Sequence, residues 1–285
     1  MVQLLLTEQS PLYQPMTEMV RSRRMIFLAG LPGVGKSLFL QQLALLAQAM
    51  ARPVHLLQWD VTRASFETAD ILNKYPEIEG VTHAMIRKAV GMWARDGVAA
   101  WANHFPADHL LIGEVPLIGN RLMELAQVYE DAAEPLLASA QTLFVIPAPS
   151  VRVRAAIERA RQATITRPQH DREAADAPPN LLQGLWEELY QLAGVLGLLE
   201  TENEIPPYDP AVYAGVYQHL LGHRPQMVLA VDELLRPFGS VYDVPGIVSE
   251  LAASPAEVLR IINHLESAYT AVQIEEAVAG WYQLF

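Results

Sequence analysis

The sequence predicts an α/β protein with three layers (αβα), in which helices cover both faces of a parallel sheet of five strands. Three observations predict this fold. Short apolar runs alternate with helical segments along the chain. The runs are apolar at nearly every position, as in strands buried on both faces. A glycine-rich turn joins the first run to an apolar helix. We therefore expect a single domain over residues 1–285.

The predicted strands are the apolar runs at 25–29, 53–59, 108–113, 142–146 and 227–231. Helical composition and spacing predict helices over 37–50, 82–103, 117–140, 183–200, 211–223 and 254–271, with a short helix in the polar segment 61–80. The last helix has a clear start, because Ser254 is followed by proline and by Glu257, which completes a capping box. We describe residues 183–224 as a helical insertion between the fourth and fifth strands.

Composition limits the classes of function. The formal net charge of -12 argues against nucleic-acid or anionic-membrane partners. The chain has no cysteine, which excludes disulfides, thiolate metal sites and a cysteine nucleophile. The N-terminus lacks a basic region and a long apolar run, and the apolar stretch 38–51 contains three glutamines. We expect a soluble, cytoplasmic protein.

The most specific motif is a phosphate-binding loop that matches G-x-x-x-x-G-K-[ST] at Gly30, Leu31, Pro32, Gly33, Val34, Gly35, Lys36 and Ser37. The glycines let backbone N–H groups approach phosphate oxygens, and the helix that follows directs its positive end at the same anion. The lysine reaches the β and γ phosphates, and the serine hydroxyl binds Mg²⁺. The motif predicts a nucleoside-triphosphate site, with ATP and Mg²⁺ as its ligands.

Four further residues follow two of the predicted strands. Asp60 ends the second strand, at the edge of the sheet where ligands bind, and we expect it to accept a proton from an attacking hydroxyl. Arg63 comes one helical turn later and is a candidate for holding an anionic substrate group. Glu114 follows the third strand and is the candidate for catalysis and for binding the Mg²⁺-water, and Arg121 is a second substrate-binding candidate.

Residues 150–182 form a basic, lid-like insertion after the fourth strand that contains Arg152, Arg154, Arg159, Arg161, Arg167 and Arg172. Arginine stabilises charge on a transferring phosphoryl group, and a segment here is able to close over ATP. If 151–162 is a helix, Arg154 and Arg161 share one face, and Glu158 lies four residues after Arg154. Arg154 is the candidate catalytic arginine; which arginines contact phosphate stays open.

Together these features resemble the nucleoside and nucleotide kinase-like group of P-loop proteins over about residues 25–270. The resemblance implies a kinase that transfers the γ-phosphoryl of Mg-ATP to a hydroxyl or phosphate of a nucleoside, nucleotide or other small acceptor, with Lys36 among the catalytic residues. It also implies that Arg236 to Tyr242 contact the base of the nucleotide. The Asp-Arg-Ser and Asp-Gly signatures of known subfamilies are missing, so the acceptor and the oligomeric state stay open.

A second interpretation is an AAA-like or signalling ATPase. The run Val228 to Glu233 matches the hhhhDE pattern of a Walker B strand, in which Asp232 would hold Mg²⁺-bound water and Glu233 would activate the hydrolytic water. Phosphate release without an acceptor would favour this alternative, and acceptor-dependent ADP formation would favour the kinase.

Overall fold

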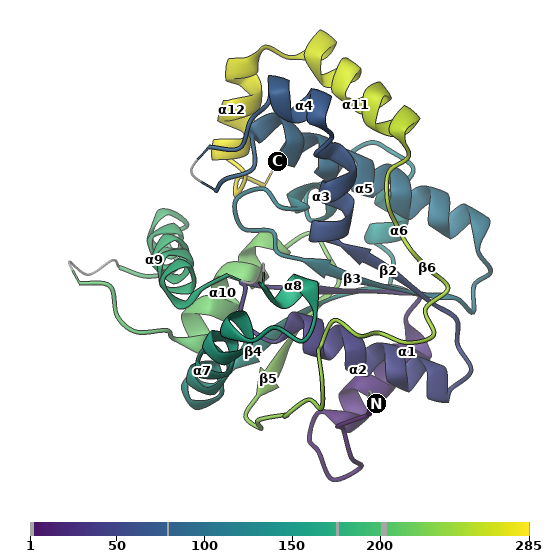
Figure 1. The fold of residues 1–285 in the computed structure, drawn as a ribbon, viewed down its shortest axis with the longest axis vertical. Coiled ribbons are helices and arrows are strands. Elements are labelled where there is room, and N and C mark those ends of the chain that lie inside the picture. The colour runs from purple at the N-terminus through teal and green to yellow at the C-terminus, as the bar shows by residue number, and fades with distance from the viewer. Residues whose placement is uncertain (1–2, 79, 175–176, 201–203, 285) are drawn as a thin grey trace.

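The computed structural model describes residues 3–78, 80–174, 177–200 and 204–284 (Figure 1). Within these residues, six strands form one parallel sheet in the order β5-β4-β1-β3-β2-β6. The strands are β1 (Met25–Ala29), β2 (Val54–Gln58), β3 (Leu110–Val115), β4 (Thr142–Pro149), β5 (Gln226–Val231) and β6 (Ser249–Glu250). The predicted α/β class and its three layers are confirmed.

The predicted number of five strands is wrong, because β6 adds an edge to the sheet. Its two residues pair in parallel with His55 and Leu56 of β2. The hydroxyl oxygen of Ser249 also lies 2.7 Å from His55 Nδ1. A strand this short carries no periodic pattern of apolar residues, so only the tertiary contact defines it.

The described helices are α1 (Tyr13–Ser22), α2 (Lys36–Ala49), α3 (Trp59–Phe66), α4 (Ala69–Lys74), α5 (Ala84–His104), the 3₁₀ turn η1 (Met123–Leu125), α6 (Glu134–Leu137), α7 (Val151–Thr166), α8 (Asp171–Ala174), α9 (Pro179–Val195), α10 (Pro210–Leu220), α11 (Pro255–Ala268) and α12 (Ala271–Ala279). The capping box of Ser254 and Glu257 at the start of α11 is confirmed. No helix in the described part of the chain is both long and apolar enough to cross a lipid bilayer.

Alternate side chains of each strand enter two separate cores. Ile26 and Leu28 of β1 pack with α1 and α2 on one face of the sheet. Met25, Phe27 and Ala29 face the other way, into the core that α5, α9 and α10 build, and α11 and α12 pack outside α5 (Figure 1). Burial on both faces explains why the strands are apolar at every position.

Two glutamines of the apolar helix α2 hold one irregular segment against its surface. Gln41 Nε2 donates to the carbonyl oxygens of Ser240 and Asp243, each at 2.9 Å. Gln48 donates to the carbonyl of Pro245. These contacts fix the segment 232–248, which we call the C-terminal strap, as it runs along α2 from β5 to the opposite edge of the sheet (Figure 1). Polar groups inside an otherwise apolar helix are thus paired, as buried polar groups must be.

The predicted helix over 117–140 is wrong. The chain there turns through left-handed conformations at Leu117, Asn120 and Leu122, and only η1 and α6 are helical. Arg95 of α5 explains the departure, because its buried guanidinium donates to the carbonyl oxygens of Glu124 (2.6 Å) and Gln127 (3.0 Å). Carbonyls that a helix would have paired internally are satisfied by a side chain from another element.

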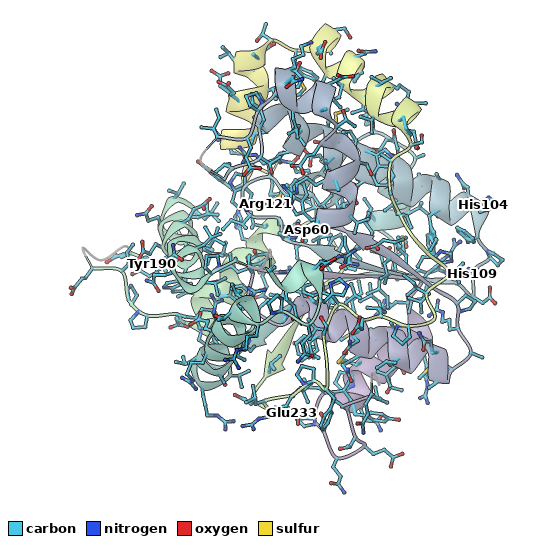
Figure 2. All side chains as sticks on the ribbon, in the orientation of Figure 1. Asp60, His104, His109, Arg121, Tyr190 and Glu233 are labelled. Carbon is cyan, nitrogen blue, oxygen red and sulfur yellow. The ribbon has the colours of Figure 1, made fainter. Side chains whose placement is uncertain are left out.

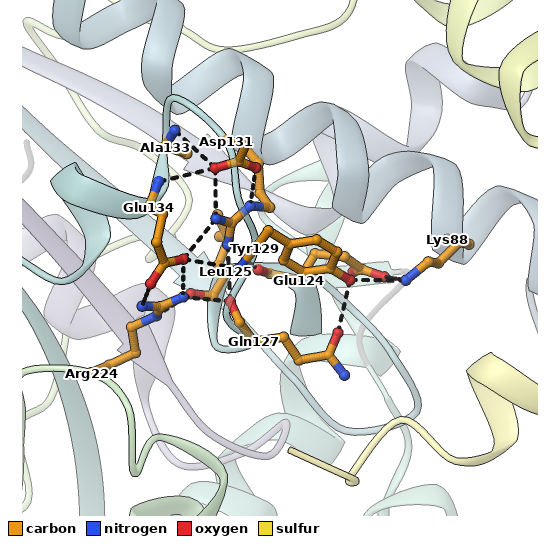
Figure 3. A network of polar contacts seen from close by, with 10 residues as sticks. Lys88, Glu124, Leu125, Gln127, Tyr129, Asp131, Ala133, Glu134 and Arg224 are labelled. Atoms are coloured by element: carbon orange, nitrogen blue, oxygen red, sulfur yellow. Dashed lines mark hydrogen bonds and ion pairs between the residues drawn. The ribbon is translucent and has the colours of Figure 1, made fainter. Parts of the chain in front are cut away.

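Arg95 belongs to a polar network that ties α5 to the end of the helical insertion (Figure 3). It forms ion pairs with Asp131 (2.6 Å) and Glu134 (2.8 Å). Arg224, just before β5, forms an ion pair with the same Glu134 (2.6 Å) and donates from Nε to the carbonyl of Leu125 (2.9 Å). Since both guanidinium groups are buried, Glu134 is the shared counter-ion for two charges.

This network makes stability depend on pH. Burial acts to raise the pKa of Glu134, but hydrogen bonds from Arg224 and Arg95 outweigh it and lower the pKa from 4.5 to about 2. A depressed carboxyl pKa contributes stability that is present above about pH 4.5 and is lost as the pH falls towards 2. We expect the free energy of unfolding in urea to fall more steeply between pH 5 and 3 in the wild type than in Glu134→Gln, by at most about 1.4 kcal/mol per pH unit. The same change at the exposed Glu8 is the matched control, and equal slopes in all three proteins would contradict the assignment.

Candidate active site

The glycine-rich loop joins β1 to α2 at the carboxyl edge of the sheet. Gly33 (φ 82°) and Gly35 (φ 91°) both adopt the left-handed region, which residues with a Cβ rarely enter. Their conformation curls the loop so that it leads directly into the first turn of α2, whose unpaired N–H groups form the positive end of the helix. Helix α10 supports the loop from behind, since a Cβ at Gly30 would lie 2.2 Å from Tyr213 Oη.

Lys36 and Ser37 meet a carboxylate from the neighbouring strand. Lys36 Nζ lies 3.5 Å from Glu114 Oε1 and donates to the carbonyl of Leu31 (3.0 Å). Ser37 Oγ donates to Glu114 Oε2 (3.1 Å). The contact follows from strand order, because β3 pairs directly with β1 and aligns Glu114 with Leu28. Burial lowers the pKa of the Lys36 ammonium, and the Glu114 carboxylate acts in the opposite direction.

These residues fit a nucleoside triphosphate with Mg²⁺. No group of three or more His, Asp or Glu side chains that would hold a metal by itself occurs among the described residues. Mg²⁺ at phosphate sites needs no such group, since it takes one or two protein oxygens together with phosphate oxygens and waters. The Ser37 hydroxyl and the Glu114 carboxylate are a suitable pair of oxygen ligands, and Lys36 and the loop amides suit the phosphates.

A cavity of about 880 Å³ opens over the loop and brings the predicted residues together. Its lining includes the loop residues Pro32, Gly33, Gly35, Lys36 and Ser37 and the charged residues Asp60, Arg63, Glu114 and Arg121. Figure 2 shows Asp60 and Arg121 at the centre of the molecule, where the elements converge. The volume is within the range of small-molecule sites.

Asp60 and Arg63 lie on the first turns of α3. Asp60 is the more available of the two, because its side chain is 70% exposed and its nearest ionic contact is Arg63 Nη2 at 3.9 Å. Arg63 Nη1 forms a closer ion pair with Glu67, at 2.9 Å. The carboxylate of Asp60 therefore faces the cavity with its lone pairs largely unused.

Helix α7 covers the loop, but with different arginines from the one predicted. Arg159 and Arg161 line the cavity, and Arg161 Nη1 lies 3.7 Å from the point where a Cβ on Gly33 would stand. Arg154 is buried elsewhere: its Nε donates to Glu158 (2.7 Å), and its guanidinium lies 4.8 Å from the centre of the Tyr208 ring. The expected neutralisation of Arg154 by Glu158 is confirmed. Arg154 does not line the cavity, because its guanidinium contacts Glu158 and the ring of Tyr208; its predicted catalytic role stays a prediction.

The segment after β5 forms one wall of the cavity. Arg236, Pro237, Gly239, Val241 and Tyr242 line it, as do Ala156, Ile157 and Ala160 of α7. Apart from Arg236, these two segments contribute mainly apolar and aromatic groups to the lining, which suit contact with a planar ring. Leu181 and Leu185 of α9 also line the cavity and were not predicted, because their apolar spacing is that of any amphipathic helix.

Asp232 and Glu233 do not line this cavity. Glu233 accepts a hydrogen bond from Ser10 in the N-terminal segment, and the carbonyl of Asp232 accepts one from Arg152 (2.6 Å). Figure 2 places Glu233 near the N-terminal segment, away from Asp60 and Arg121. Their strand, β5, is also separated from β1 by β4. The Walker B pattern at 228–233 is therefore not positioned next to the loop.

No family model matches this sequence, and no curated protein matches it either. The arrangement of side chains around the loop is therefore the basis for assigning a function.

Proposed function

We propose that the protein is an ATP-dependent kinase that transfers the γ-phosphoryl group of Mg-ATP to a small acceptor. One observation carries the proposal: Lys36, Ser37 and Glu114 at the loop share a single cavity with Asp60 and Arg121 on the opposite side. A kinase, unlike a hydrolase, needs polar groups for an acceptor beside those for the nucleotide, and Asp60 and Arg121 are such groups in this cavity.

Each residue has a defined task in this reaction. The loop amides and Lys36 bind the phosphates, and Ser37 and Glu114 orient the metal. Asp60 accepts the proton that the acceptor hydroxyl loses as its oxygen attacks phosphorus. Arg161 and Arg159 of α7 approach from above, where they stabilise negative charge on the phosphoryl oxygens and help to exclude water. Mg-ATP supplies the phosphoryl group and the metal charge that offsets the phosphates.

The test is ADP formation with Mg-ATP across nucleosides, nucleotides, sugars and other hydroxyl compounds, followed by Asp60→Asn with the best acceptor. We expect acceptor-stimulated turnover, with kcat lowered by about 10²-fold or more in Asp60→Asn, because a positioned general base contributes on that order. The affinity for ATP is expected to change little, since Lys36 forms its ion pair with Glu114 and not with Asp60. Asp70→Asn on α4, an exposed aspartate, is the matched control.

Full activity of Asp60→Asn with every active acceptor would overturn its role as a base. Phosphate release that no acceptor stimulates would overturn the kinase in favour of ATP hydrolysis at the same loop; Glu233→Gln would then test whether Asp232 and Glu233, which lie outside the cavity, take any part.

A further inference from the structure

Two arginines that share one small space have no carboxylate partner in the described part of the chain. Arg121 follows β3 and lines the main cavity, and Arg87 lies on α5. Their Nη1 atoms lie 3.4 Å and 3.6 Å from one point, the position where a Cβ on Gly119 would stand. Arg87 Nη1 donates to the carbonyl of Gly119 (2.8 Å), and Arg121 Nη1 makes only a long contact with the carbonyl of Ile118 (3.4 Å).

The half-buried pair of Arg87 and Arg121 differs from the buried arginines Arg95 and Arg224 described above. Arg95 and Arg224 each form close ion pairs, which is how a buried guanidinium is normally stabilised. Arg87 Nε is instead buried without a hydrogen-bond partner. Burial lowers the pKa of both Arg87 and Arg121; the charge of Arg121 lowers the pKa of Arg87 further, while the charge of Glu188 acts in the opposite direction on both. Two guanidinium charges that lack a close counter-ion raise the free energy of the ligand-free protein, and a bound anion would lower it.

Two carboxylates, Glu188 and Glu275, line a second cavity beside Arg87, and only the charge of Glu188 acts on both arginines. Glu188 of α9 lies across this cavity of about 320 Å³, which Arg87 and Gly119 also line. Its charge acts on both arginines, but it forms no ion pair with either within 4 Å. Arg121 lines the main cavity together with Asp60, whereas Arg87 and Gly119, which has no side chain, line the second cavity. An oxyanion between the two guanidinium groups would therefore be reached along Arg121, from the side where Asp60 lies.

We propose that Arg87 and Arg121 bind an oxyanion carried by the phosphoryl acceptor, a phosphate monoester or a carboxylate, and that Glu188 accepts a hydrogen bond from a donor group next to it. This inference rests on the proposed function, which it narrows to anionic acceptors. An anion held at Gly119 places the rest of the acceptor in the main cavity, with Asp60 available for its hydroxyl. Paired guanidinium groups suit this task because each offers two parallel N–H donors to two oxygens.

The test uses two probe anions, inorganic phosphate and acetate, titrated by calorimetry into the full chain saturated with Mg²⁺ and AMP-PNP. The nucleotide analogue fills the phosphate positions of the loop, so a further anion binds elsewhere. We expect one probe to bind, with binding weakened roughly tenfold or more in Arg87→Met and in Arg121→Met and less in Arg87→Lys, because charge-assisted bonds are lost. Arg260→Met, an exposed arginine paired with Asp96, is the matched control. Preference for phosphate or for acetate identifies the class of acceptor.

Melting temperatures separate binding from a structural role. If the arginines form a ligand site, the Arg121→Met variant keeps or raises the melting temperature of the ligand-free protein. The same substitution weakens the binding of the probe anion. Equal anion binding in wild type and both Met variants, or no binding of either anion to the wild type, would overturn the proposal. Failure of AMP-PNP to bind would count against the proposed function alone. The titration would then be repeated with Lys36→Ala as the reference protein. Weaker anion binding after Arg121→Met is added to that variant would still support the site.

Discussion

Replacement of Lys36 by alanine is expected to lower acceptor-stimulated ADP formation by on the order of 10²–10³-fold, and to weaken the binding of Mg-ATP. The ammonium group is buried at the loop, where it touches the carbonyl of Leu31 and the carboxylate of Glu114. In a site shielded from water, a fixed positive charge stabilises the charge that develops on a transferring phosphoryl group far more than it would in solvent. Steady-state kinetics and calorimetry with AMP-PNP measure the two effects.

Lys74→Ala provides the control, because Lys74 is an exposed lysine of α4 that pairs with Glu266 at 2.8 Å, outside the cavity. It is expected to retain wild-type kinetics. A Lys36→Ala protein that remains folded and binds Mg-ATP with unchanged affinity would disprove the assignment of the loop as a triphosphate site.

The largest expected effect on stability comes from Gly91→Ala in the middle of α5. A Cβ there would lie 1.6 Å from Glu124 Oε2 and 2.3 Å from its Cδ, so the carboxyl group has to leave its place. Glu124 is fully buried and forms an ion pair with Lys88 (3.0 Å), which would be broken (Figure 3). We expect a loss of about 3 kcal/mol or more in the free energy of unfolding, as for other disrupted buried ion pairs and overpacked cores. Urea denaturation measures it.

Gly184→Ala in α9 is the matched control. This glycine is also inside a helix, but a Cβ there meets nothing within 4 Å. Alanine at this position is expected to stabilise the chain by roughly 0.5–1 kcal/mol, because it reduces the conformational freedom of the unfolded state. If both variants unfold at the same urea concentration, the clash with Glu124 is not a determinant of stability.

The parts of the fold that the sequence predicts correctly are those where local chemistry and tertiary environment agree. Strands β1 to β5 are mainly apolar runs bounded by turn residues, and β1, at the centre of the sheet, is buried at every position. The loop motif predicts where α2 begins, because Gly33 and Gly35 turn the backbone through the left-handed region directly before Lys36. Asp60 and Glu114 were predictable since the ends of parallel strands converge on one edge of the sheet.

The errors lie where distant residues decide the local structure. The segment 117–140 has the composition of a helix, but the guanidinium of Arg95 takes its carbonyl oxygens and the backbone turns at Asn120 and Leu122. No local pattern within residues 117–140 indicates that an arginine more than twenty residues earlier binds their carbonyl oxygens. The edge strand β6 was not predicted for the same reason, because its pairing with His55 is a contact between remote parts of the chain.

The arginines of the site show the same limit. Helical spacing predicts that Arg154 and Arg161 share a face, yet only Arg161 lines the cavity, because Tyr208 and Glu158 hold Arg154. Arg87 was not singled out, since a single arginine in an amphipathic helix has the pattern of a solvated surface residue. Arg87 and Arg121 come close together only in the folded chain, at the turn around Gly119.

The C-terminal strap has a consequence for how the protein is made. Both outer strands, β5 and β6, come from the last quarter of the chain, and the strap between them crosses the whole width of the sheet along α2. A nascent chain that has emerged only as far as residue 225 has both sheet edges open, with unpaired backbone groups on β4 and β2. During translation, β5 therefore becomes available to cover its edge of the sheet before β6 does. The sheet is protected against pairing with strands of other chains only after residue 250 has left the ribosomal exit tunnel.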